Sequence, residues 1–163
     1  MGRCCHGDDP KFIRVSTERS HSLEVHLRGR RCLTAACLEG VPDGAKSLVL
    51  IIDDPDAPDP KAPKTVWVHW VVYNIPPNSE SLPENAGKTR LPQGALFRLN
   101  DFKKTGYGGP CPPIGRHRYF HKLYALDITL DLRGATKSQV ERAMQGHVLA
   151  NAELIGTYQK GDQ

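Results

Sequence analysis

Two histidines, a tyrosine and two aspartates fall in three short blocks whose joint chemistry is that of an anion pocket. The blocks are DPDAP at 54–58, VWVHW at 66–70 and GPCPPIGRHRY at 109–119. The imidazoles of His69 and His117 and the phenol of Tyr119 can each donate a hydrogen bond to a phosphoryl oxygen. Histidine can also become cationic when an anion arrives, which strengthens such bonds. Because residues 71–108 separate the second block from the third, only folding can unite all three.

Asp54 and Asp56 carry the wrong charge to touch an anion directly. We expect them to hold a histidine in one tautomer or to accept the ammonium of a zwitterionic head group. The proline and glycine residues around them restrict or set the backbone conformation, so these loops are built to hold a shape. The sequence contains neither a Walker loop nor a dinucleotide fingerprint, and we expect no cofactor and no metal.

Strands are predicted to position these side chains. Residues 47–53 form a short apolar, β-rich run that ends at the first block, and residues 65–75 form a second strand. In that second strand one face is predicted to hold Trp67, His69, Val71 and Tyr73, and the other Val66, Val68, Trp70 and Val72. Both faces are therefore expected to be covered, which gives the strand a central place in a sheet. A third strand is expected over 118–130, and its alternation points His117 and Tyr119 the same way.

One helix is predicted after the third strand. Thr136 and Gln139 have the spacing of a capping box, and Val140, Met144 and Val148 follow at helical intervals, so we expect the helix to end near Ala150. The stretch from 75 to 97 is rich in Pro, Asn, Ser and Gly and is expected to be a long loop.

Composition favours one globular domain in the cytoplasm. The chain has 163 residues, of which 39% are hydrophobic, and no apolar run approaches the ~20 residues of a membrane span. The first residues lack a signal peptide's apolar stretch, and five cysteines without framework spacing fit a reducing compartment. The net charge of +4 is spread along the chain rather than concentrated, so a mixed surface and no nucleic-acid partner are expected.

The motifs resemble the phosphatidylethanolamine-binding protein (PEBP) family, in particular its bacterial and archaeal branch, labelled Raf kinase inhibitor-like or YbhB/YbcL-like. The resemblance covers roughly residues 40–160. It rests on DDPDAP at 53–58, VWVHWVVYNIP at 66–76, NDFKKTGYGGPCPP at 100–113, GRHRYFHKLYALD at 115–127, GATKSQVERAM at 134–144 and GHVLANAELIGTY at 146–158. Residues 40–163 are therefore predicted to be a PEBP-like domain. Residues 1–39 are atypical, since a basic, cysteine-rich stretch stands where relatives have a proline-containing segment.

The resemblance implies a mainly β fold, with a large antiparallel sheet packed on a smaller one and short helices near the C-terminus. It implies a protein that is not an enzyme and that binds phosphate, a phosphate monoester or a phospholipid head group. A protein kinase or protease is the partner class that it suggests, and a homodimer is left open. The pocket positions that match the family are Asp54, Asp56, His69, His117 and Tyr119, with Ala57, Trp67, Gly109, Pro110 and Pro112 as walls.

Other interpretations of single residues stay open at this stage. Cys111 lies six residues before His117, and a thiolate beside an imidazole would make a thiol-dependent hydrolase. His69, His117 and Asp54 could instead form the ligand set of a metal-dependent hydrolase. Arg118 is expected to pair with Asp56 or Asp101. His121 and His147 are expected to be structural or exposed, and Asp127 to orient a histidine or bond at a strand end.

Overall fold

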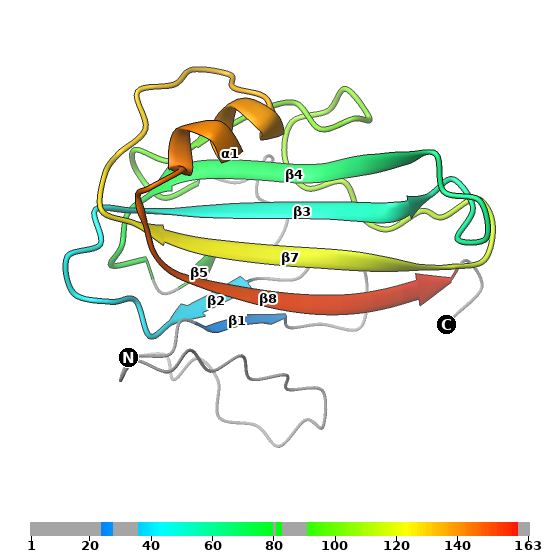
Figure 1. Ribbon diagram of the computed structural model, residues 1–163, viewed down its shortest axis with the longest axis horizontal. Coiled ribbons are helices and arrows are strands. Elements are labelled where there is room, and N and C mark those ends of the chain that lie inside the picture. Colours follow the sequence, from blue (N-terminus) through cyan, green and yellow to red (C-terminus); the bar gives the residue numbers. More distant parts are fainter. Residues whose placement is uncertain (1–23, 28–35, 80, 83–90, 160–163) are drawn as a thin grey trace.

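The computed structural model describes residues 24–27, 36–79, 81–82 and 91–159, and these residues form two antiparallel sheets and one α-helix (Figure 1). The larger sheet has the strand order β6-β4-β3-β7-β8, and the smaller has the order β1-β2-β5. The strands are β1 (Glu24–Leu27), β2 (Ala36–Glu39), β3 (Ser47–Ala57), β4 (Thr65–Ile75), β5 (Ser81–Leu82), β6 (Leu96–Phe97), β7 (Arg116–Leu126) and β8 (Val148–Gln159). The mainly β architecture with a large and a small antiparallel sheet is confirmed. The remainder of the predicted atypical segment 1–39 lies outside the described residues, and the proposed boundary at residue 40 stays a prediction.

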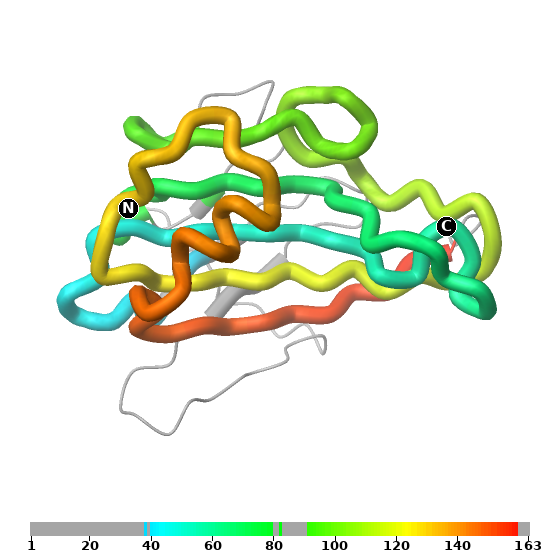
Figure 2. Tube along the Cα trace, turned by 45° about the horizontal axis from the view of Figure 1, so that its top comes forward, coloured from blue at the N-terminus to red at the C-terminus, as the bar shows by residue number. Residues whose placement is uncertain are grey.

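Helix α1 (Lys137–Met144) covers one face of the larger sheet (Figure 2). It begins at the predicted capping box, in which Gln139 N–H donates to Thr136 Oγ1 and Thr136 N–H donates to Gln139 Oε1. The predicted end near Ala150 is wrong. Gly146 adopts a φ of +79°, which suits glycine and ends the helical path, and the chain then enters β8.

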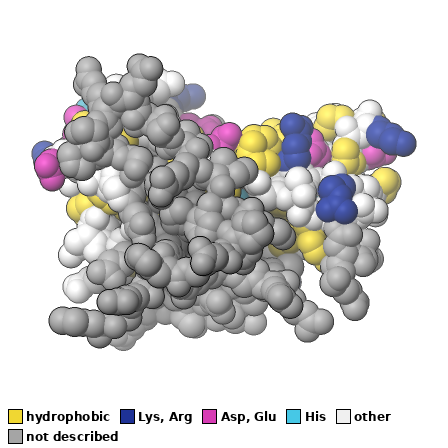
Figure 3. Space-filling view, turned by 90° about the horizontal axis from the view of Figure 1, so that it is seen from below, with side chains coloured by type: hydrophobic (Ala, Val, Ile, Leu, Met, Phe, Trp, Pro, Cys, Tyr) yellow, Lys and Arg dark blue, Asp and Glu magenta, His cyan; other side chains and the backbone are white. Residues whose placement is uncertain are grey.

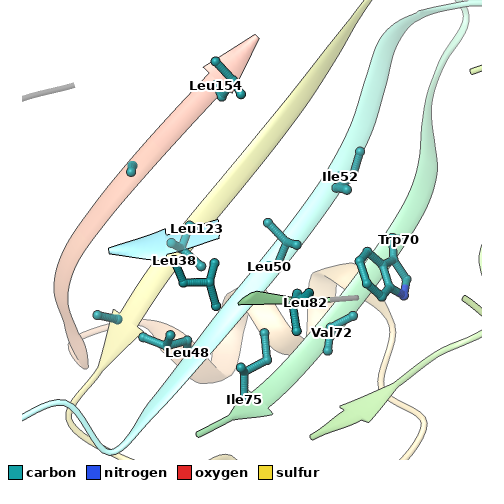
Figure 4. Packing of buried hydrophobic residues seen from close by; sticks show 12 residues of the cluster. Leu38, Leu48, Leu50, Ile52, Trp70, Val72, Ile75, Leu82, Leu123 and Leu154 are labelled. Atoms are coloured by element: carbon teal, nitrogen blue, oxygen red, sulfur yellow. The ribbon is translucent and has the colours of Figure 1, made fainter. Parts of the chain in front are cut away.

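The larger sheet separates two hydrophobic clusters. One cluster lies between this sheet and β2 and β5, so the two sheets pack on each other (Figure 4). It contains Leu38 and Leu82 from the smaller sheet together with Leu48, Leu50, Ile52, Trp70, Val72, Ile75, Leu123, Ala125, Ala152 and Leu154. The other cluster joins Val49, Ile51, Val71 and Tyr73 to Val140 and Met144 of α1. We call these the inner face and the helix face of the larger sheet.

A β-bulge in β4 changes the predicted alternation. Ile52 pairs with Trp70 but Asp53 pairs with Val68, so His69 is an extra residue with no partner on β3. Val68 consequently packs with Val71 and Tyr73 on the helix face, whereas Trp70 belongs to the inner face. The expected alternation of Trp67, His69, Val71 and Tyr73 on one face therefore breaks at His69.

Strand β3 runs through Pro55 to Ala57, four residues beyond the predicted end. Its pairing with β7 stops at Asp53 and Phe120, because Pro55 has no N–H to donate. Arg118 N–H lies beyond the end of this pairing and donates to the Asp56 carboxylate, at 2.9 Å from Oδ2. Strand β7 also begins two residues earlier and ends four residues earlier than the predicted 118–130.

Candidate functional site

The three sequence blocks meet at one end of the larger sheet. Asp54 on β3 pairs with Trp67 on β4, and its side chain bonds His117 on β7. The rings of His69 and Tyr119 are 5.2 Å apart at their centroids, and those of His117 and Tyr119 are stacked at 6.5 Å. His117 and Tyr119 therefore share one side of β7, as predicted.

His117 is fully buried and hydrogen-bonded at both ring nitrogens. Nδ1 lies 2.6 Å from Asp54 Oδ2, and Nε2 lies 2.9 Å from the carbonyl oxygen of Ile114. A carboxylate and a carbonyl only accept hydrogen bonds, so a ring protonated at both nitrogens satisfies both contacts. Asp54 thus orients a histidine, as expected, and its other oxygen accepts Asp56 N–H at 2.8 Å. The Nε2–H expected to meet a ligand is held by the chain's own loop.

Asp56 is buried and forms a forked ion pair with Arg118. Nη2 and Nε of Arg118 donate to the two carboxylate oxygens at 2.7 and 2.9 Å. The hydrogen bonds from Arg118 lower the pKa of Asp56 against the opposing effect of burial. Of the two partners expected for Arg118, the ion pair is with Asp56, while Asp101 Oδ2 accepts Val68 N–H. Asp56 therefore fixes the loop and is not turned toward a ligand.

His69 donates from Nδ1 to the carbonyl oxygen of Gly108 at 2.6 Å. Gly108 N–H returns a hydrogen bond to the His69 carbonyl at 3.2 Å, so the bulged residue is held through backbone and ring together. Burial of the ring lowers the pKa of His69, with the Gly108 bond acting in the opposite direction. His69 is consequently neutral at pH 7, with its proton on Nδ1 and a lone pair on Nε2.

Aromatic side chains surround the His69 ring. Phe102 and Tyr107 lie 5.5 and 6.4 Å from it, and Trp67 packs edge-on against Phe102 at 5.3 Å. Gly108 has no room for a side chain, since a Cβ there would lie 2.6 Å from the Phe102 ring. Phe102, Tyr107 and the carbonyls of Gly108 and Ile114 were missed as site elements. The aromatics were visible in the 100–113 motif, but nothing in a sequence marks a backbone carbonyl as an acceptor.

The remaining predicted wall residues lie beside Asp56 and between Gly108 and Ile114. Ala57 is buried and precedes a cis peptide bond to Pro58. Between the two carbonyls that hold the histidines, Gly109 and Pro110 are half-buried and Pro112 is buried. Cys111 is a free, exposed thiol.

Three further predicted residues lie apart from the ligand-facing groups. His121 is buried on the inner face, where its Nδ1 lies 3.3 Å from the carbonyl of Tyr119. Asp127 follows the opposite end of β7 and bonds His147 Nδ1 at 2.8 Å, so it has no contact with the pocket residues. His121 and His147 are structural, as expected.

The geometry gives the two hydrolase alternatives no support. His117 has neither a free lone pair to bind a metal nor a free nitrogen to take a proton from Cys111. Within the described ranges no three His, Cys, Asp or Glu side chains gather to hold a metal, and no helix is long and apolar enough to cross a membrane. On the coloured part of the surface in Figure 3, charged and hydrophobic side chains are interspersed.

A groove of about 340 Å³ lies on the helix face, and of the residues in the three blocks only Val68 lines it. It runs between α1 and the segment after β6, and Arg98, Leu99, Asp101 and Lys137 are among its lining residues. None of the predicted site residues lines it. The predicted ligand-facing side chains and this groove are therefore separate features.

Comparisons with known proteins agree with the motifs. The model of a family described as Phosphatidylethanolamine-binding protein matches residues 34–159. A UPF0098 protein of Methanothermobacter thermautotrophicus is 56% identical over 125 residues, which cover 76% of this chain and 80% of the relative. The crystal structure of CT736, a PEBP homologue of Chlamydia trachomatis, superposes with a TM-score of 0.69 at 44% identity, covering 79% of this chain and 82% of that one. YbcL of Escherichia coli gives 0.68 at 34% identity, covering 78% and 79%.

Proposed function

Because the chain belongs to the phosphatidylethanolamine-binding protein family, we propose that it is a non-enzymatic protein that binds a small anion or a phosphate-bearing head group beside His69 and Tyr119. The observation that carries the proposal is the meeting of the three blocks around the His69, His117 and Tyr119 rings. A role in restraining a kinase or another signalling partner belongs to the same proposal and rests on the family alone.

Trp67 adds a hydrogen-bond donor to this site. Its indole Nε1 is buried and finds no acceptor in the part of the chain that the structure describes. A buried N–H without a partner costs free energy, and such groups are usually satisfied by water or by a ligand. An oxyanion placed beside Trp67 and His69 would supply the missing acceptor.

Calorimetric titration with methyl phosphate tests the binding proposal. Wild-type protein is expected to bind weakly, since the described ligand-facing groups offer few cations. Trp67→Phe keeps an aromatic ring and removes only the N–H, and it should weaken binding by about ten- to a hundredfold, the value of a hydrogen bond to a charged group. Asp54→Asn, which alters the support of His117, should also weaken it. His147→Gln at the far end of β7 is the control, and equal affinities in all four proteins would remove the assignment of the site.

The non-enzymatic part of the proposal has its own test. With both of its nitrogens held by Asp54 and Ile114, His117 is not free to act as the base that thiol catalysis by Cys111 needs. We expect no turnover of esters, peptides or phosphoesters, and unchanged methyl phosphate binding in Cys111→Ala. Turnover that disappears in Cys111→Ala would establish a thiol enzyme instead.

A further inference from the structure

The hydrogen bond of His69 decides what the site offers a ligand. The carbonyl of Gly108 can only accept, so the 2.6 Å contact places the ring proton on Nδ1. Nε2 then carries a lone pair, and none of the described residues bonds it. At this atom the ligand-free site therefore accepts a hydrogen bond and does not donate one.

The surroundings of His69 oppose a positive charge on its ring. The ring is 2% exposed and lies among Phe102, Tyr107 and Tyr119. Burial lowers the pKa, whereas the carboxylates act against that shift from a distance. The titratable and charged groups around it are Asp53 and Asp54 on β3, His117, Tyr119 and His121 on β7, and Asp101 and Tyr107 on the segment between β6 and β7.

Two atoms of the site differ in what they need from a ligand. Nε2 of His69 is an acceptor, and the indole N–H of Trp67 is a donor for which the described chain provides no partner. Of these two atoms, a fully ionised oxyanion would satisfy only the Trp67 N–H, because it has only acceptor atoms. An oxyacid that retains one proton has a hydroxyl for His69 and an oxygen for Trp67.

We propose that the site selects oxyacids that bind with one proton at His69 Nε2, so that a phosphate monoester is held as its hydrogen-phosphate form. This inference rests on the proposed function and names its ligand class. The same complex forms when a dianion arrives with a proton from solvent, because the proton is shared between His69 and the ligand oxygen in either case. Binding of a dianion is therefore coupled to uptake of one proton.

The coupling of ligand binding to proton uptake determines how affinity changes with pH. Phosphate monoesters lose their second proton near pH ~6. Below that value the ligand brings its own proton and affinity is flat with pH. Above it one proton must be taken up, so affinity falls about tenfold for each further pH unit. A site that binds the dianion through neutral donors behaves oppositely, because its affinity rises through pH ~6 and then stays level.

Calorimetry with methyl phosphate at pH 8, in buffers of different ionisation enthalpy, counts the protons directly. We expect wild-type protein and His147→Gln to take up about one proton for each ligand bound. In His69→Gln the side-chain amide can donate without titrating, so uptake should vanish and the fall in affinity above pH ~6 should disappear. Methyl sulfate, whose charge is constant, should also bind more weakly as pH rises, because His69 must supply the proton.

The outcomes separate the two proposals. Binding of methyl phosphate without proton uptake, or uptake that persists in His69→Gln, overturns the inference and leaves the proposed function standing. Absence of binding by both methyl phosphate and methyl sulfate at pH 5.5 overturns the proposed function, and this inference with it.

Discussion

Asp53 and Asp54 are neighbours on β3, are equally buried, and serve opposite faces of the sheet. The Asp53 carboxylate lies on the helix face, where Nζ of Lys122 and Nζ of Lys137 approach Oδ2 at 3.0 and 2.7 Å. The Asp54 carboxylate turns the other way and bonds His117. Successive strand residues point to opposite faces, so one step along the chain moves a carboxylate from one environment to the other.

The two faces differ in the kind of partner that each carboxylate has. Lysines stay charged at physiological pH, so the helix face has a permanent ion cluster that ties α1 to β3 and β7. On the inner face the partners are imidazoles, whose charge depends on pH and on their neighbours. The helix face is therefore held by charges that persist at physiological pH, whereas the inner face contains groups whose charge can change with pH.

Removing the charge of Asp53 should cause the largest loss in the free energy of unfolding. Asp53→Asn leaves two largely buried ammonium groups close together, and breaking such a pair costs about 3 to 5 kcal/mol. We expect the free energy of unfolding, measured in urea, to fall by about this amount. Asp43→Asn, at an exposed carboxylate, is the control. An unchanged stability in Asp53→Asn would show that the cluster contributes nothing net.

Acid should lower the stability of the folded protein through His121 on the inner face. Burial lowers the pKa of this ring to about 4. In the unfolded chain the pKa is about 6.5, so only the unfolded state binds the proton as pH falls from 6.5 to 4. The stabilisation is complete above pH 6.5, and up to about 3 kcal/mol is lost on the way to pH 4, at no more than about 1.4 kcal/mol for each pH unit.

Urea unfolding at several pH values checks this contribution. His121→Gln should flatten the slope of unfolding free energy between pH 6.5 and 4, because the amide does not titrate. His69 adds to the slope in the same direction, since its pKa is also lowered, so the difference between variants is the informative quantity. His147→Gln replaces a more exposed histidine and serves as the control substitution. Equal slopes in all three proteins would contradict the assignment of His121.

Several features of the two faces could be predicted from the sequence, because they depend on local residue patterns. The bounds of β4 coincide with the apolar run at 65–75, and the capping box at Thr136 forms as its spacing indicates. The alternation of β7 turns Arg118 away from His117 and predicted an ion pair with Asp56 or Asp101, and the structure has the pair with Asp56. These features depend on residue type and period, both of which a single sequence contains.

The expectations that differ from the structure share a physical cause, which is the path of the backbone. The bulge at His69 inserts one residue into β4, and no side-chain pattern in 65–75 marks it. Val148 continues the helical spacing of Val140 and Met144, yet it begins β8, because pairing with β7 along Arg116–Leu126 outweighs one more helical position. The histidines were expected to donate to a ligand, but they donate to the carbonyls of Gly108 and Ile114, whose positions only the fold determines.

The smallest effect should come from the N-terminal cap of α1. Thr136 Oγ1 accepts Gln139 N–H at 3.1 Å, and Thr136→Ala removes this acceptor at a typical cost of about 1 kcal/mol. The loss should appear as a lower urea midpoint with unchanged methyl phosphate affinity, because among the described residues α1 packs on the helix face and the ligand-facing groups lie elsewhere. Thr136→Ser retains the hydroxyl and should retain most of the stability. Equal losses in both variants would assign the effect to the threonine methyl group, and a change in affinity would mean that the two faces are coupled through β3.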